Sequence, residues 1–448
     1  MYRINLYIII CITSIQFSYA QYAYQNKNSI DVYDAHKLIA KTDGFVKDTP
    51  VVAVIDKGVL INHTHIQNSM WINYHEIPDN GIDDDGNGFI DDVYGWNVEQ
   101  HSPDVSNGGV GNWHGTPVNG IISAIINNPE SQSCVQLLNV VKGESVASII
   151  QALQYVYTMR KLFNETNGEK GAYIVAVNCS WGKDSLWESD YPQWCAMYDS
   201  LGSVGVLSIH AVSNEYTNVE KVGDMPSLCS SDYLITVTDI LPTGIIPAAY
   251  GRYSVDVAAP GNYSYTYVNT GGYGYFGGTS AAAAYVTATV ALLYNLSIIT
   301  GQNQAKHNPA ETALLCKNAI LCGVQKTPEL TYKTVSGGVL NVFGAMKYIC
   351  DYEGKAYMYH DIYELLRIVS VYPMPINGYG FVQIESGSDV KAILSLVDDA
   401  GVTIQQTNIC IQKGIDIFSI DFSKIQTGTY TLRVHTSHIS RSVMIIIE

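Results

Sequence analysis

Three side chains of the types that perform acyl transfer lie far apart in the sequence. Asp56 directly follows an apolar run, His114 opens a stretch with apolar residues at helical spacing, and Ser280 precedes a small and apolar segment. Nucleophilic acyl transfer needs a hydroxyl, an imidazole to remove its proton and a carboxylate to fix the imidazole tautomer. Each residue alone is more simply a turn residue, a satisfied polar residue or a helix cap. Their combination at element boundaries of one predicted domain favours a catalytic triad.

The elements that must position these residues alternate between residues 51 and 350. Short β-branched runs are separated by amphipathic stretches, of which Ser145–Phe163 carries apolar residues on one helical face. This alternation predicts an α/β fold, a parallel sheet covered by helices, with its site at the carboxyl ends of the strands. The expected strands are Val51–Ile55, Val135–Val141, Tyr173–Val177, Val204–His210 and Leu234–Thr238.

A different pattern begins after about Tyr357, where short strands are separated by turn signals such as Gly387 and Thr427-Gly428. This pattern predicts a separate small C-terminal β-sandwich. The expected strands there are Phe381–Ile384, Ala392–Val397, Ile415–Phe422, Thr429–Val434 and Ser442–Ile447. The predicted domains are a signal peptide at 1–20, an N-terminal segment at 21–50, the α/β domain at 51–350, a linker at 351–370 and the sandwich at 371–448.

The first residues are typical of an export signal. Arg3 supplies a positive end, Leu6–Phe17 is mostly apolar, and Ser18-Tyr19-Ala20 offers small residues for a peptidase. No other stretch is long and apolar enough to be expected to span a bilayer. The nine cysteines have no C-x-x-C spacing, so they predict neither a disulfide framework nor a zinc site, and their pairing stays open.

The charge balance excludes some classes of partner. The formal net charge is −16, which argues against nucleic acid or an anionic membrane surface. The acidic residues are also clustered in the sequence: the segment from Gly58 to Val141 contains ten Asp and Glu residues and neither Lys nor Arg.

The acidic run starting at Asp83 opens like the D-x-[DN]-x-[DN]-G calcium loop, with Gly86 permitting the sharp turn. Its twelfth position is Tyr94 instead of Glu, so the spacing resembles the short calcium repeats of thrombospondin type more than an EF-hand. A solvated acidic turn is the alternative. Hard oxygen ligands favour a structural Ca²⁺, and no cofactor is expected for catalysis. The expected ligands are Asp83, Asp85, Asn87, the carbonyl of Phe89, and Asp91 or Asp92.

Residues 51 to about 300 resemble the subtilase family of serine peptidases. The family has an aspartate after a V-A-V-I-D-[ST]-G strand, a histidine opening H-G-T-H-V-A-G, and a serine in G-T-S-M-A-A-P. The corresponding segments here are Val52–Gly58, His114–Val118 and Gly278–Ala284. The resemblance implies that Asp56, His114 and Ser280 are the catalytic residues of a peptidase.

Two further segments carry the same resemblance. Ala211–Glu215 is similar to the family's A-A-G-N-E, which implies that Asn214 donates to the oxyanion beside the backbone N–H of Ser280. Residues 178–182 resemble the substrate-aligning strand, which implies that Ser180, Trp181 and Gly182 bind the peptide backbone as an added strand.

Several positions depart from the family motifs. Lys57 replaces a Ser or Thr, Ser213 a glycine, Ala281 a methionine and Ala284 a proline, while Pro117 and Asn119 replace a histidine and an alanine. None of these changes removes a catalytic group. They leave open a rival hypothesis, a surface binding protein on a subtilase scaffold with impaired catalysis.

The C-terminal segment has its own resemblance. Val371–Gly378, with the later Asp421–Ile425 and Gly428–Leu432, resembles the sorting domains of the type IX secretion system. The expectation is therefore an exported endopeptidase that acts on proteins or peptides and is delivered by the type IX machinery. It would be secreted or held at the outer-membrane surface of a Gram-negative bacterium.

Overall fold

The computed structural model describes residues 30–41, 48–63, 66–106, 114–128, 131, 133–268, 272–300, 304–354, 366–387, 390–398, 401–412, 414–436 and 440–448. The expected signal peptide and residues 21–29 and 42–47 of the expected N-terminal segment lie outside the described residues, as do residues 355–365 of the expected linker. The chain separates into two compact units, one within Gln25–Met358 and one within Tyr359–Glu448. None of the helices in the described part of the chain is long and apolar enough to cross a membrane.

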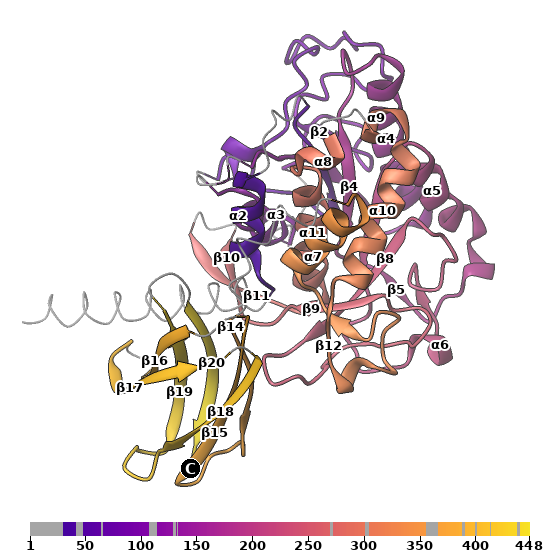
Figure 1. Cartoon of the computed structure of the whole chain (residues 1–448). Coiled ribbons are helices and arrows are strands. Elements are labelled where there is room, and N and C mark those ends of the chain that lie inside the picture. Colours follow the sequence, from indigo (N-terminus) through magenta and orange to yellow (C-terminus); the bar gives the residue numbers. More distant parts are fainter. Residues whose placement is uncertain are drawn as a thin grey trace, which may run out of the picture. The chain divides into compact units, whose positions relative to one another are not determined.

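The larger unit is built on a nine-stranded sheet in the order β12-β13-β9-β8-β6-β4-β1-β3-β2 (Figure 1). Its central strands pair in parallel, as the alternating sequence predicts. Every residue of β1 is buried, which explains why this strand is an unbroken apolar run. The strands are β1 (Val51–Asp56), β2 (Gly95–Asn97), β3 (Gln136–Val141), β4 (Ile174–Cys179), β6 (Leu207–Ala211), β8 (Leu234–Ile240), β9 (Val257–Pro260), β12 (Gln325–Lys326) and β13 (Gly338–Val339).

Helices cover the sheet. Helices α4 and α5 share one hydrophobic core with Val51, Ala53 and Ile55 of β1, while Val52 and Val54 on the other face of the strand are also fully buried. Helix α7 packs against β4, β6, β8 and β9. The helices are α2 (Val32–Lys41), α3 (Gly115–Ile126), α4 (Val146–Glu165), α5 (Pro192–Ser203), α6 (Val219–Val222), α7 (Thr279–Leu293), α8 (Ser297–Thr300), α9 (Gln304–His307), α10 (Pro309–Cys322) and α11 (Val342–Tyr352).

Helix α7 is buried along its whole length, as expected for a segment that is small or apolar on all sides. Helix α4 begins after Ser145, whose hydroxyl caps the helix by accepting from the backbone N–H of Ser148 at 3.1 Å. Two short antiparallel pairs, β10 (Ser264–Tyr267) with β11 (Tyr273–Phe276) and β5 (Lys183–Asp184) with β7 (Asp224–Met225), lie outside the main sheet.

The smaller unit consists of two antiparallel sheets around one apolar core, β14-β15-β18 and β17-β16-β19-β20. The sequence analysis predicts five of these strands and misses β14 and β17. The strands are β14 (Leu366–Tyr372), β15 (Tyr379–Ser386), β16 (Val390–Val397), β17 (Thr403–Ile411), β18 (Gly414–Asp421), β19 (Gly428–His435) and β20 (Ser440–Ile447).

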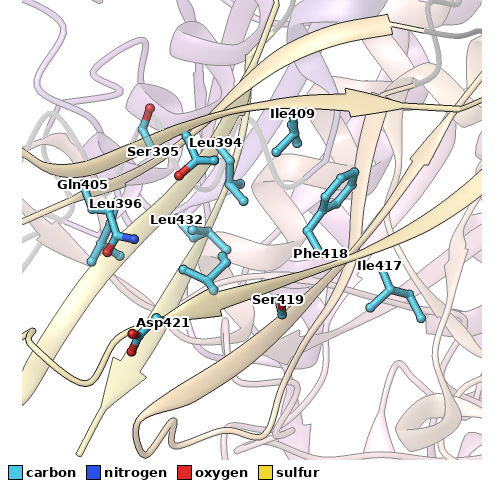
Figure 2. Close-up of a pocket in the computed structure, with 12 residues that line it drawn as sticks. Leu394, Ser395, Leu396, Gln405, Ile409, Ile417, Phe418, Ser419, Asp421 and Leu432 are labelled. Carbon is cyan, nitrogen blue, oxygen red and sulfur yellow. The ribbon is translucent and has the colours of Figure 1, made fainter.

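A cavity of about 490 Å³ lies between the two sheets of this sandwich (Figure 2). Its lining comes from β16, β17, β18 and β19, and β17 and β18 are edge strands of their sheets. Most of the lining is aliphatic or aromatic, including Leu394, Ile409, Phe418 and Leu432. It contains neither a histidine nor a cysteine.

Candidate active site

Asp56 is the last residue of β1, and its side chain lies at the carboxyl end of the parallel sheet. The residue is 3% exposed. Its Oδ1 accepts a hydrogen bond from the backbone N–H of Lys57 at 2.7 Å, which holds the carboxylate at the strand end. This is the position at which open parallel sheets carry their functional groups.

His114 immediately precedes α3 and lies between Asp56 and Ser280. Its Nδ1 is 2.9 Å from each carboxylate oxygen of Asp56, and its Nε2 is 3.2 Å from Ser280 Oγ. The helix can approach β1 this closely because residue 115 is glycine, since a Cβ there would lie 2.3 Å from Gly58 O. The structure therefore brings together the three residues that the sequence analysis selects.

Ser280 is the second residue of α7 and follows a glycine with a left-handed backbone, Gly278 at φ 76°. The Oγ of Ser280 also lies 3.1 Å from the backbone oxygen of Ser180, and the Ser180 hydroxyl donates to Ser280 O at 2.9 Å. Because Ser280 is in the first turn of the helix, its backbone N–H has no partner within the helix.

Asn214 follows β6 and reaches the start of α7. Its Oδ1 accepts from the backbone N–H of Thr279 at 3.0 Å and from the Thr279 hydroxyl at 3.1 Å. A Cβ on Gly278 would lie 2.4 Å from this oxygen, so glycine is required for the contact. With its oxygen held by Thr279, Asn214 keeps its amino group for donation next to Ser280.

The segment Ser180–Gly182 directly follows β4. Trp181 is fixed by a hydrogen bond from its Nε1 to Ile55 O at 2.7 Å, and Gly182 is exposed. The ammonium group of Lys142 lies 4.8 Å from the centre of the Trp181 ring, within the range of a cation–π contact. The segment thus lies beside both Asp56 and Ser280.

The pKa of His114 is set by opposing influences. Burial lowers it, but the charge of Asp56 and the hydrogen bond that His114 Nδ1 donates to that carboxylate raise it more, so it lies above its ordinary value of 6.5. The charges of Lys57 and Lys142 lower it in part. Lys57 forms an ion pair with Glu144 at 2.9 Å, and burial lowers the pKa of Lys142.

The departures from the family motifs lie around the triad without displacing it. Ala281 and Ala284 are fully buried in α7. Asn119 donates to Gly115 O at 2.8 Å and to Asn139 Oδ1 at 2.9 Å, and Ser213 Oγ accepts from the backbone N–H of Glu215 at 3.2 Å. The hydroxyl, imidazole and carboxylate remain aligned for proton transfer and nucleophilic attack.

The acidic loop divides into two neighbouring groups. Carboxylate oxygens of Asp83, Asp85 and Glu76 lie within 4.8 Å of one another. Asp92 is fully buried and accepts from Tyr155 Oη at 2.7 Å. Burial raises the pKa of Asp92 to about 7.

Asn73 connects the two groups, because its amide donates to Asp85 Oδ2 and to Asp92 Oδ1, both at 2.9 Å. Asn87 also donates to both carboxylates, at 3.2 Å to Asp85 Oδ2 and 3.1 Å to Asp92 Oδ2. The carboxylate of Asp91 accepts from the backbone N–H groups of Asn80 and Gly81.

Some features of this loop are not predicted by its sequence motif. Glu76 lies outside the acidic run, and only the fold brings it to the cluster. The side chain of Phe89 packs edge-on against Trp96 and Tyr155. Lys170, distant in sequence, donates to the backbone oxygen of Asp85 at 2.6 Å, so the loop has a cation nearby after all.

Two other features near the site carry no sequence signal. A disulfide joins Cys195 in α5 to Cys229, and the spacing of the cysteines does not indicate this pair. Asp224 is a buried carboxylate near Gly182, and it belongs to none of the motifs.

Comparison with known proteins identifies the family and the fold. Residues 47–345 match the subtilase family, and residues 370–448 match the secretion system C-terminal sorting domain. Subtilisin-like protease 1 of Plasmodium vivax is 24% identical over 339 residues, which are 68% of this chain and 48% of that protein. The chain thus spans about half the length of this curated relative.

Two solved structures share the fold. A structure of the subtilase cytotoxin assembly aligns with a TM-score of 0.52 at 20% identity, covering 73% of this chain and 97% of the other. The epidermin leader peptide processing serine protease of Staphylococcus aureus aligns with a TM-score of 0.50 at 18% identity, covering 72% and 80%. The family match spans well over half of the sequence, and the chain therefore belongs to the subtilase family of serine peptidases, with a C-terminal sorting domain.

Proposed function

We propose that this protein is a secreted serine endopeptidase that cleaves peptide bonds with Ser280, His114 and Asp56. The observation that carries the proposal is the position of His114, 2.9 Å from both Asp56 oxygens and 3.2 Å from Ser280 Oγ. An imidazole held between a carboxylate and a hydroxyl can take the hydroxyl proton and later return it.

In this mechanism His114 Nε2 removes the proton of Ser280 Oγ as the oxygen attacks the substrate carbonyl carbon. The resulting oxyanion accepts hydrogen bonds from the amide of Asn214 and the backbone N–H of Ser280. His114 then gives the proton to the leaving amine, which breaks the peptide bond and leaves an acyl group on Ser280. Water, activated by the same imidazole, releases the acyl group. Asp56 accepts from His114 Nδ1 throughout and stabilises the imidazolium.

The peptide substrate would bind as an extended strand along Ser180, Trp181 and Gly182. The fixed ring of Trp181 and the lack of a side chain at the exposed Gly182 support this placement. A peptide lying there would pass Ser280 with its carbonyl facing Asn214.

The direct test compares hydrolysis of an unfolded protein by the parent chain and by Ser280→Ala. Ser280 is 7% exposed and loses only one oxygen in this change, so the variant should keep its fold. Hydrolysis should fall by orders of magnitude, because members of a triad act as a unit. Equal rates would contradict the assignment. A folded parent with no activity on any peptide would favour the impaired binding protein instead.

We further propose that the acidic loop holds a structural Ca²⁺. Glu76, Asp83 and Asp85 present converging carboxylates, and Asn87 and Asp92 lie beside them. Hard oxygen donors of this kind suit calcium. The ion would neutralise repulsion within the loop, and the carbonyl of Phe89 and the carboxylate of Asp91 stay predicted ligands. It would have no part in the chemistry at Ser280.

The C-terminal sandwich supports a proposal about delivery. Residues 370–448 match a secretion sorting domain, so we infer export through the type IX machinery to the surface or surroundings of a Gram-negative bacterium. The residues of the apolar core of the sandwich all lie between Leu366 and Ile447. This module would therefore serve delivery and not hydrolysis.

A further inference from the structure

Asp224 lies beside the segment that we propose to bind substrate. It belongs to β7, which pairs with β5, so that Asp184 faces Asp224 and Lys183 faces Met225. Strand β5 begins directly after Gly182. The backbone of Ser213, the residue before Asn214, also contacts the Asp224 carboxyl and lowers its pKa. Asp224 therefore lies between the two segments that flank Ser280.

The Asp224 carboxyl is buried without a cation. The residue is 2% exposed, and its Oδ2 accepts from the hydroxyl of Ser227. Its Oδ1 has no hydrogen-bond partner, and no ion pair to this residue occurs within the part of the chain that the structure describes. Burial, opposed by the Ser227 hydrogen bond, raises the pKa of Asp224 to about 6. A buried carboxylate with an unused acceptor is costly unless another group pairs with it.

The free oxygen lies next to the space that a side chain at Gly182 would fill. A Cβ there would be 3.0 Å from Met225 O, 3.8 Å from Ala211 O and 3.8 Å from Asp224 Oδ1. All three neighbours are oxygen acceptors. Because residue 182 is glycine, no side chain of its own covers these oxygens, and a substrate group that approaches past Gly182 meets acceptors suited to a positively charged hydrogen-bond donor.

We propose that Asp224 makes the enzyme specific for lysine or arginine at the residue that supplies the attacked carbonyl. This inference rests on the proposed function. That residue must lie between Ser180–Gly182, which would bind its backbone, and Asn214, which would bind its carbonyl oxygen. Its side chain then points between the segments toward Asp224 Oδ1.

A cationic side chain of the substrate would offset the free-energy cost of burying the unpaired Asp224 carboxylate. A lysine ammonium carries three N–H donors, and it can pair with Asp224 while donating to a backbone oxygen such as Met225 O. A neutral side chain of similar length would leave the carboxylate unpaired in the complex. Sites that are built to bind a polar group reject an analogue that lacks it for this reason.

The first test uses matched fluorogenic peptides that differ only in having lysine, arginine, norleucine or glutamate before the cleaved bond. The parent should cleave the lysine and arginine peptides with the highest kcat/KM. Asp224→Asn should lower kcat/KM for the lysine peptide about 100-fold, or about 2.8 kcal/mol at 1.4 kcal/mol per factor of ten, while the norleucine peptide changes little. Asp184→Asn, which removes an exposed charge from the paired strand, should leave the preference unchanged.

A second measurement separates this inference from the proposed catalysis. Ser280→Ala should bind the lysine peptide more tightly than the norleucine peptide in calorimetry, and adding Asp224→Asn should remove the difference. This measurement reports binding without turnover, and it compares two peptides on the same folded variant. Equal binding of the two peptides by Ser280→Ala, or a parent that cleaves norleucine as well as lysine, would overturn the role of Asp224. Lysine-selective binding without hydrolysis would support Asp224 while contradicting the proposed function.

Discussion

The side-chain oxygen of Asn214 accepts two hydrogen bonds from Thr279, from its backbone N–H at 3.0 Å and from its hydroxyl at 3.1 Å. Thr279 is the residue immediately before Ser280, and the single proton of its hydroxyl is shared between Asn214 Oδ1 and Val212 O, which lies nearer at 2.7 Å. This arrangement fixes the orientation of the amide. The amino group of Asn214 is therefore the part that can serve a ligand at Ser280.

Asn214→Ala should reduce kcat far more than it changes KM, because the amide would donate mainly to the oxyanion of the transition state. In subtilisin, a well-studied member of this family, removing the corresponding donor lowers kcat about 10²–10³-fold, and we expect the same order here. Steady-state kinetics on one peptide would measure the effect. Glu215→Gln, an exposed neighbour, is the control. A tenfold rise in KM with unchanged kcat would argue against an oxyanion role.

The activity should depend on pH through His114. The imidazole must be neutral to accept the serine proton, and its pKa lies above 6.5. Acidification below that pKa protonates His114, so kcat/KM should fall to half its plateau at a pH above 6.5. A half-point near pH 4 would point to carboxyl chemistry instead.

Lys57→Gln removes a cation that lowers the His114 pKa. The fall of kcat/KM on acidification, the acidic limb of the pH profile, should therefore move to higher pH. The shift should be small, because the Lys57 side chain is 52% exposed and solvent screens its charge. Lys161→Gln removes a charge from the surface of α4 and should leave the limb in place. Movement to lower pH in Lys57→Gln would contradict the electrostatic account.

Calcium should stabilise the protein through the acidic loop. An ion that binds only the folded state adds about 2.7 kcal/mol at a hundred times its Kd. The melting temperature of the parent should therefore be higher in millimolar calcium than in chelator, and Asp83→Ala/Asp85→Ala should lose this difference. Asp232→Ala/Glu329→Ala, which removes the same charge from exposed positions, should keep it. Equal calcium shifts in the parent and the loop variant would place the site elsewhere.

Removing the C-terminal module should not affect catalysis. The larger unit lies within Gln25–Met358 and contains the whole candidate site. A chain that ends at Gly354, just after α11, should hydrolyse peptides with the kcat/KM of the full chain. In the native host the same truncation should abolish delivery to the medium or surface. A folded but inactive truncation would show that the sandwich takes part in the chemistry.

The sequence predicted the α/β fold because buried parallel strands are unbroken apolar runs. Strand β1 extends to Asp56 instead of Ile55, and β4 extends to Cys179 instead of Val177. The sandwich strands that were missed have weaker patterns. Most of β17 is exposed and polar, and β14 lies at the start of the module, where only its last two residues, Val371 and Tyr372, belong to the first motif.

The residues of the candidate site that lie within local sequence motifs could be predicted. Asp56, His114, Ser280 and Asn214 each stand in a recognisable segment, and the fold places them as those segments imply. Glu76 and Asp224 could not be predicted, because Glu76 stands seven residues before the acidic run and Asp224 joins the site through contacts with segments distant in the sequence. The packing of several elements decides whether an oxygen of a buried carboxylate has a hydrogen-bond partner. The spacing of residues in the sequence cannot predict this.

The most direct test of the central claim is labelling with a fluorophosphonate probe, which reacts only with an activated serine. The parent chain should be labelled at Ser280, as located by peptide mass spectrometry, and His114→Ala should abolish labelling because the hydroxyl then lacks its base. Ser203→Ala, at the end of α5, should be labelled like the parent. A folded parent that takes up no label, or that is labelled equally after His114→Ala, would contradict the triad.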